Sequence, residues 1–386
     1  MTSSQTSVEI FLEFRDLARR MATFVGADVI AENYRPNYRS WMSLTATTTY
    51  MVTIPYTIWY YYPDYIFILQ SLAIIGIGVQ GFFKFYSALV HRKFFQGRIK
   101  YLEDFHRQQT NHPWNRIILR DLMRNSFLVG KFLIATYLSA AFGFALYPIY
   151  IYVVYGERVL PLTALLPGIN ADSHTGYFLT LGFQLFVLGL GLSGMSAADL
   201  AILLFVVNLA ALVDVFKGSL QELNVLLEAP IRDEQAIRKK TRDIFLEHGS
   251  IENYESELDE RYFFINFIQI VSAVSCMSIS LFLCYTTNYL PGYAFLVGAF
   301  FQLLEFCLLG TIFTVKNNHM IDAIYDVKWY LLPLKERREW NFLLHKSQNA
   351  IDLTVGGFSK LNLETFVAII NTIYQYFAIL INFVEN

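Results

Sequence analysis

Seven stretches of the chain are apolar enough and long enough to cross a bilayer. Several exceed 18 residues, the length at which an apolar run predicts a membrane helix. The stretches are separated by short turns or by charged, amphipathic segments. The predicted spans are 40–60, 65–89, 127–155, 176–212, 261–287, 293–315 and the last stretch, 350–386. The pattern therefore predicts an all-α membrane protein with seven transmembrane helices.

The polar segments predict an N-terminal arm and a helical anchor outside the membrane. Span 4 stays apolar past Asp199, which lies about 35 Å along a helix that starts near Gly176, beyond a hydrocarbon core of about 30 Å. We therefore expect this helix to continue into the anchor. The expected units are an amphipathic arm (1–39), spans 1 to 4 (40–212), anchor helices (213–260), spans 5 and 6 (261–315), a further anchor helix (316–349) and span 7 (350–386).

The distribution of Lys and Arg predicts the orientation. Nearly all of them fall in 1–39, 90–126, 213–261 and 316–349, whereas the opposite side holds only Arg158. Basic residues favour the cytosolic side, so we expect a cytosolic N-terminus and anchor and an extracellular C-terminus. A G-protein-coupled receptor has the reverse orientation, and we interpret the Glu260-Arg261-Tyr262 triplet that resembles its motif as coincidence.

Composition removes several other classes of function. The chain is 55% hydrophobic with a net charge of −2, which gives no support for binding nucleic acid. The seven histidines show no helical pairing with a nearby Glu, and the chain contains no nucleophile elbow or P-loop. We therefore expect no catalytic residues, no metal site and no cofactor.

Aromatic and small residues gather in the half of spans 2 to 5 that we expect to face outward. Small residues beside aromatic rings suit a concave apolar site, although the same pattern also fits ordinary core packing. The candidate ligand-binding residues are Phe67, Ser71, Ala140, Gly143, Phe144, Tyr147, Phe183, Phe186 and Tyr285.

Polar side chains recur along one face of the last span. Glu364, Asn371, Gln375 and Asn382 are spaced by 7, 4 and 7 residues, which returns each to nearly the same direction on a helix. Such a stripe favours either a helix–helix interface or the wall of a water-filled pore.

The C-terminal third carries motifs that resemble those of insect odorant receptors. They are Tyr325-x-x-x-Trp329-Tyr330, Leu353-Thr354-x-Gly356-Gly357-Phe358 and Leu361-x-Leu363-x-Thr365-Phe366. The length, the seven spans and the inverted orientation agree with that family. The chain resembles a ligand-tuning subunit of mosquito or fly type, because it lacks the enlarged segment between spans 4 and 5 that marks the co-receptor.

The resemblance implies a subunit of a ligand-gated, non-selective cation channel. It implies a hetero-oligomer, a tetramer, with the odorant co-receptor in the plasma membrane of an olfactory neuron. A small volatile odorant, which we expect to be aromatic or heteroaromatic, would bind in the outer half of the bundle. Span 7 would line the pore, with Gln375, Ile379, Asn382 and Phe383 forming the lining and gate. The alternatives are a gustatory-type homomeric channel and a G-protein-coupled receptor or transporter.

Overall fold

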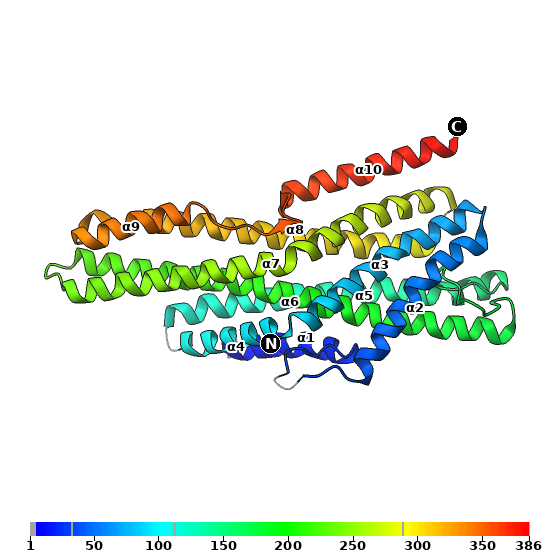
Figure 1. Ribbon diagram of the computed structural model, residues 1–386, viewed down its shortest axis with the longest axis horizontal. Coiled ribbons are helices and arrows are strands. Elements are labelled where there is room, and N and C mark those ends of the chain that lie inside the picture. Colours follow the sequence, from blue (N-terminus) through cyan, green and yellow to red (C-terminus); the bar gives the residue numbers. More distant parts are fainter. Residues whose placement is uncertain (1–4, 32–33, 111–112, 288, 386) are drawn as a thin grey trace.

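The chain folds into a long bundle of helices with one short hairpin. The computed structural model describes residues 5–31, 34–110, 113–287 and 289–385. Figure 1 shows the helices running roughly along one axis, with the C-terminal helix lying apart from the others. The elements are α1 (Ser7–Phe24), α2 (Tyr38–Tyr61), α3 (Tyr65–Val90), α4 (Arg92–Gln109), α5 (Pro113–Tyr155), α6 (His174–Glu228), α7 (Glu234–Thr287), α8 (Leu290–Tyr325), the 3-10 turn η1 (Trp329–Leu331), α9 (Leu334–Ser347), β1 (Thr354–Val355), β2 (Ser359–Lys360) and α10 (Leu363–Glu385).

Six of these helices have the length and hydropathy of membrane spans, namely α3, α5, α6, α7, α8 and α10. The first predicted span is α2, a helix of 24 residues that packs on α3 and is less apolar because it is rich in threonine. Two of its buried threonine hydroxyls are satisfied within the helix. Thr53 Oγ1 donates to Tyr50 O at 2.7 Å, and Thr57 Oγ1 donates to Thr53 O at 2.7 Å. Local bonding of this kind lets a threonine-rich helix enter an apolar environment.

Three helices run without a break from the spans into the anchor. The prediction that span 4 continues past Asp199 is confirmed, because α6 extends over 55 residues, about 80 Å at 1.5 Å per residue. The helix α7 is 54 residues long, and α8 reaches Tyr325. The boundaries expected at 212/213, 260/261 and 315/316 therefore fall within continuous helices. The fully buried Trp340 of α9 packs on Phe245 of α7, with ring centroids 6.3 Å apart.

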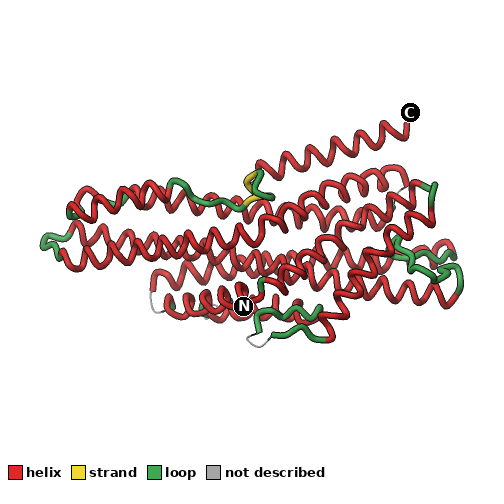
Figure 2. The backbone as a smooth tube through the Cα atoms, viewed as in Figure 1, coloured by secondary structure: helices red, strands yellow, loops and turns green. Residues whose placement is uncertain are grey.

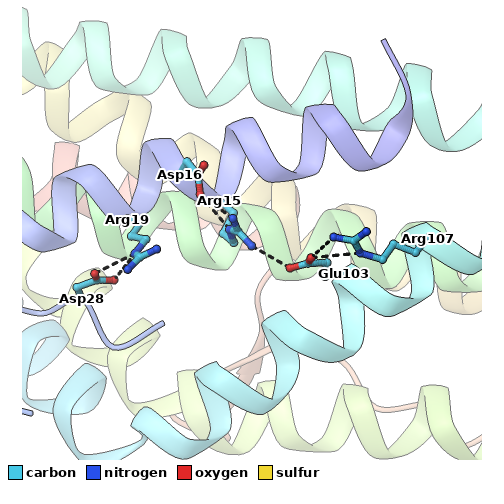
Figure 3. Close-up of polar contacts among 6 residues, drawn as sticks. All are labelled: Arg15, Asp16, Arg19, Asp28, Glu103 and Arg107. Atoms are coloured by element: carbon cyan, nitrogen blue, oxygen red, sulfur yellow. Dashed lines mark hydrogen bonds and ion pairs between the residues drawn. The ribbon is translucent and has the colours of Figure 1, made fainter. Parts of the chain in front are cut away.

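The N-terminal arm contains the expected amphipathic helix and docks on the bundle. Thr6 caps α1 through a capping box with Glu9, and Phe11 and Phe14 are completely buried against α5 and α6. On its other side, Arg15 Nη1 donates to Glu103 of α4 at 2.8 Å, as Figure 3 shows. The arm is therefore packed against its own chain.

A hairpin connects the anchor to the last helix. Gly356 and Gly357 both have positive φ, at 60° and 76°, which explains why two glycines occupy the turn between β1 and β2. The hairpin is tied to α7, where Asp259 Oδ1 accepts from Thr354 N at 2.7 Å and from Thr354 Oγ1 at 2.8 Å. Figure 2 shows the strands in yellow at the start of α10. Because the hairpin occupies the beginning of the 350–386 unit, the helix itself begins at Leu363.

Candidate functional site

An apolar cavity of about 250 Å³ lies inside the helix bundle. It is walled by α2, α3, α5, α6, α7 and α8 and continues to the segment after α1. Glycine and alanine leave the space open because they have little or no side chain, and aromatic rings form the rest of the wall. The cavity-lining residues that illustrate this are Gly76, Ala140, Gly191, Phe85, Phe144 and Phe295.

Two of the predicted ligand-binding residues line this cavity. Ala140 lies opposite Gly298, where an added Cβ would stand 3.3 Å from the Ala140 Cβ. Phe144 is 3% exposed and packs in a cluster with Tyr50, Ile54 and Leu162. Phe183 packs against that same cluster without lining the cavity.

The other predicted ligand-binding residues lie outside the cavity. Ser71 is buried, and its Oγ donates to Thr163 O at 2.8 Å. Gly143 is in close contact with α8, because a Cβ there would stand 2.6 Å from the Cβ of Ala294. The ring of Tyr147 meets Tyr289 edge-on, with centroids 6.1 Å apart.

The remaining candidates are aromatic residues on the surface of the subunit. Phe67 stacks on Tyr61, with centroids 4.4 Å apart. Phe186 and Tyr285 are also exposed, and Tyr285 lies with its ring 6.1 Å from that of Phe377 on α10. The structure therefore does not bring the nine candidates together at one surface.

One end of the cavity wall is polar and joins four helices. Asp199 of α6 accepts three hydrogen bonds, from Lys84 of α3 at 2.5 Å, Tyr137 of α5 at 2.6 Å and Gln302 of α8 at 2.9 Å. All four residues line the cavity, and Lys84 and Asp199 are almost completely buried. Glu305 is also buried, and neither of its carboxylate oxygens has a hydrogen-bond partner among the described residues.

The sequence does not predict that Lys84 and Asp199 pair with each other. Lys84 and Asp199 each stand out as a charge within an apolar run, which is the available signal. Their pairing across 115 residues depends on the rotation of two helices about their axes, which the hydrophobic period does not specify.

The last helix presents its polar stripe away from its own subunit. Glu364, Asn371, Gln375 and Asn382 are all exposed, whereas Ile369 and Ile373 face α7 and α8 and are buried. The predicted gate residue Ile379 is 60% exposed on the subunit. The side chain of Phe383 lies outside the described residues.

Most of the sequence matches a known family of membrane receptors. A sequence model described as the 7tm Odorant receptor family matches residues 64–374, most of the chain. The chain is an insect odorant receptor. It is therefore a multi-pass membrane receptor with a seven-transmembrane fold and not an enzyme.

Individual relatives agree with that membership. The receptor is 22% identical over 405 residues to putative odorant receptor 83c of Drosophila melanogaster, covering 99% of this chain and 100% of that one. It is 27% identical to odorant receptor 10a of the same species over 178 residues, 44% of this chain and 43% of that one. The insect olfactory receptor OR5 of Machilis hrabei, solved in complex with eugenol, has the same fold, with a TM-score of 0.80 at 12% identity over 96% of this chain and 99% of that one.

Proposed function

We propose that this receptor is the odorant-binding subunit of a ligand-gated, non-selective cation channel in the plasma membrane. A small volatile molecule binds in the apolar cavity, and its binding moves α10, which lines the pore. The observation that carries the proposal is the cavity between α3, α5, α6, α7 and α8. At about 250 Å³ it is slightly smaller than the usual small-molecule site, roughly 300–1,000 Å³, which suits a small ligand, and its walls are mainly apolar.

Two helices connect the cavity with the pore helix. Ser272 and Ala273 of α7, and Phe295 and Gln302 of α8, line the cavity. Farther along α7, Ser278 Oγ donates to Ile373 O of α10 at 3.3 Å.

The second contact joins α8 to the pore helix. The ring of Phe300 packs on that of Phe366, with centroids 5.6 Å apart. A ligand that binds more tightly to one arrangement of α7 and α8 shifts the equilibrium toward that arrangement, to the extent set by the difference in affinity. Because α10 packs on both helices, it moves with them.

The exposed face of α10 supports an assembly around a pore. Its polar stripe is unsuited to lipid, and the receptor's own bundle does not cover it. In a tetramer with the odorant co-receptor, this face meets water and permeating cations. Ile379 and Phe383 form the hydrophobic constriction, with Asn382 and Gln375 beside it. The eugenol complex of the OR5 relative supports a small aromatic ligand.

The test is to fill the cavity and measure odorant-evoked current. Ala140→Phe, co-expressed with the odorant co-receptor, should raise the half-maximal concentration at least tenfold for every activating odorant, because the new ring occupies the space beside Gly298. Leu146→Phe is the matched control on α5, since Leu146 is 54% exposed. Both variants are compared at equal surface expression, measured with an epitope tag.

A second variant separates the cavity from the outer aromatic residues. If Tyr147→Ala alters odorant potency and Ala140→Phe does not, the ligand binds near Tyr147 and Tyr289 instead of in the cavity. If neither variant alters potency over a chemically varied panel, the binding site lies elsewhere in the receptor.

A further inference from the structure

Two buried polar atoms in the cavity wall, Ser43 Oγ and Gln80 Oε1, have no hydrogen-bond partner among the described residues, and Gln80 Oε1 is the one that can only accept. Gln80 of α3 is 7% exposed and lines the cavity, and its Nε2 donates to Ser272 Oγ of α7 at 2.7 Å. Its Oε1 has no hydrogen-bond partner among the described residues. A buried acceptor left unpaired is costly, so a group that satisfies it gains binding free energy.

The orientation of this amide follows from its neighbour. Ser272 Oγ donates its single proton to backbone carbonyls of its own helix, Ile268 O at 2.6 Å or Gln269 O at 3.1 Å. The hydroxyl can then only accept from Gln80, so the NH₂ group must face Ser272 and the carbonyl oxygen must take the other position.

The charges in the cavity wall are already compensated. Asp199 is held by Lys84, Tyr137 and Gln302, and Lys84 is paired with Asp199. A charged ligand would lose its hydration without gaining a free counter-charge on this wall. Glu305 is not among the residues that line the cavity. The site therefore suits an uncharged ligand.

From these observations we infer that the ligand is a small neutral molecule with a hydrogen-bond donor, a hydroxyl or an N–H, which it presents to Gln80 Oε1. The inference rests on the proposed function and names the chemical class that the cavity selects. The apolar walls take up the rest of the molecule. A ligand with only acceptors leaves Gln80 Oε1 unsatisfied, even where it accepts from the hydroxyl of Ser43.

The experiment compares compounds that differ only in the donor. Indole and 1-methylindole, 4-methylphenol and 4-methylanisole, and 2-phenylethanol and its methyl ether are applied to cells that express the receptor with the co-receptor. In the unmodified receptor the donor member of each activating pair should be at least tenfold more potent. Gln80→Leu should bring the two members within about threefold, because the acceptor is gone.

Gln70→Leu is the matched control, with the same substitution ten residues earlier on α3. Gln70 accepts from Thr163 Oγ1 at 2.9 Å and does not line the cavity, so the potency ratio should remain that of the unmodified receptor. A ratio that collapses in Gln70→Leu and persists in Gln80→Leu overturns the assignment. Gln80→Met is a second variant in case Gln80→Leu does not reach the surface.

The measured currents distinguish a failure of the donor inference from a failure of the proposed odorant-binding function. If the methylated compounds, which lack the donor, activate the unmodified receptor as well as the compounds that have it, the donor inference is wrong and the channel function stands. If no compound evokes current at normal surface expression, while an agonist of the co-receptor still opens the channel, the proposed odorant-binding function fails.

Discussion

The helices α6 and α10 are both apolar enough to span a membrane, yet they are packed in opposite ways. In the most apolar part of α6, 83% of the residues are buried, against 11% in α10. The first is the central helix of the subunit and contacts α1, α5, α7 and α8. The second lies at the edge of the bundle (Figure 1) and packs on α7 and α8 along one side. The residues of its polar stripe are exposed.

Hydropathy alone therefore does not determine whether protein, lipid or water surrounds a membrane helix. Asp199 and Asn208, two polar residues buried on α6, are partnered within the chain. Polar groups on α10 line up along a face that the chain itself does not cover. This contrast predicts that changes on α6 act on the stability of the subunit, whereas changes on α10 act on conduction.

The largest expected effect is on the ion pair of α6. Asp199→Leu removes the hydrogen-bonded ion-pair partner of the buried Lys84, which should cost about 3–5 kcal/mol of stability. Thermal unfolding of the purified receptor measures this. The double variant Lys84→Met with Asp199→Leu should recover most of the loss, and Gln375→Leu on α10 should change stability by less than about 0.5 kcal/mol. Equal melting temperatures for Asp199→Leu and Gln375→Leu would refute the contrast.

The next effect is a pH dependence at the anchor end of α6. His106 of α4 is fully buried with its Nε2 2.7 Å from Asn208 Oδ1, and burial lowers the pKa of His106 from 6.5 to about 4. Between these values the unfolded chain binds a proton that the folded chain does not. Stability should therefore fall as pH drops from about 6.5 toward 4, by up to about 1.4 kcal/mol per pH unit.

The variant His106→Gln tests that dependence directly. Glutamine keeps a donor for Asn208 and removes the titrating group, so the melting temperature should depend less on pH between 7 and 5. His248 of α7 is also buried with a lowered pKa, so it contributes a dependence of the same sign that His106→Gln leaves in place. An unchanged pH profile in His106→Gln would assign the dependence to other groups.

The smallest effect on stability is expected at the proposed gate. Ile379 is 60% exposed, so Ile379→Ala should change the free energy of unfolding by less than about 0.5 kcal/mol. It should nevertheless raise the current in the absence of odorant, because a shorter side chain widens a dewetted constriction. Phe383→Ala should act in the same direction. Leak and odorant-evoked currents that match the unmodified channel in both variants would remove these residues from the gate.

Much of the architecture could be predicted because it depends on periodicity and length. The long apolar run through Asp199 predicts a helix that extends beyond the bilayer, and the amphipathic pattern of residues 1–39 predicts the arm. The hairpin before α10 was missed. Its strands are two residues each, too short for a period, and they are held by Asp259 on another helix.

The cavity was predicted only in part. Ala140 and Phe144, two of the predicted ligand-binding residues, line the cavity, and small and aromatic residues adjoin on this face of α5. Phe67 and Tyr285 are equally aromatic but face outward, because the rotation of each helix is set by its neighbours. Gln80 could not be singled out, since its unpaired oxygen results from the contact between α3 and α7.

The hairpin that ties α10 to α7 has a mechanical consequence. Asp259 holds Thr354, and Lys360 pairs with Asp352 at 2.6 Å, so the base of α10 is fixed, whereas Tyr374, Tyr376 and Ile379 farther along the helix are exposed. The helix is then a lever with its pivot at the hairpin. With 23 residues it is about 34 Å long, so a tilt of about 10° would carry its tip about 6 Å sideways. A change of less than an ångström between α7 and α8 near the pivot is thereby amplified into a displacement comparable to the width of a hydrated cation.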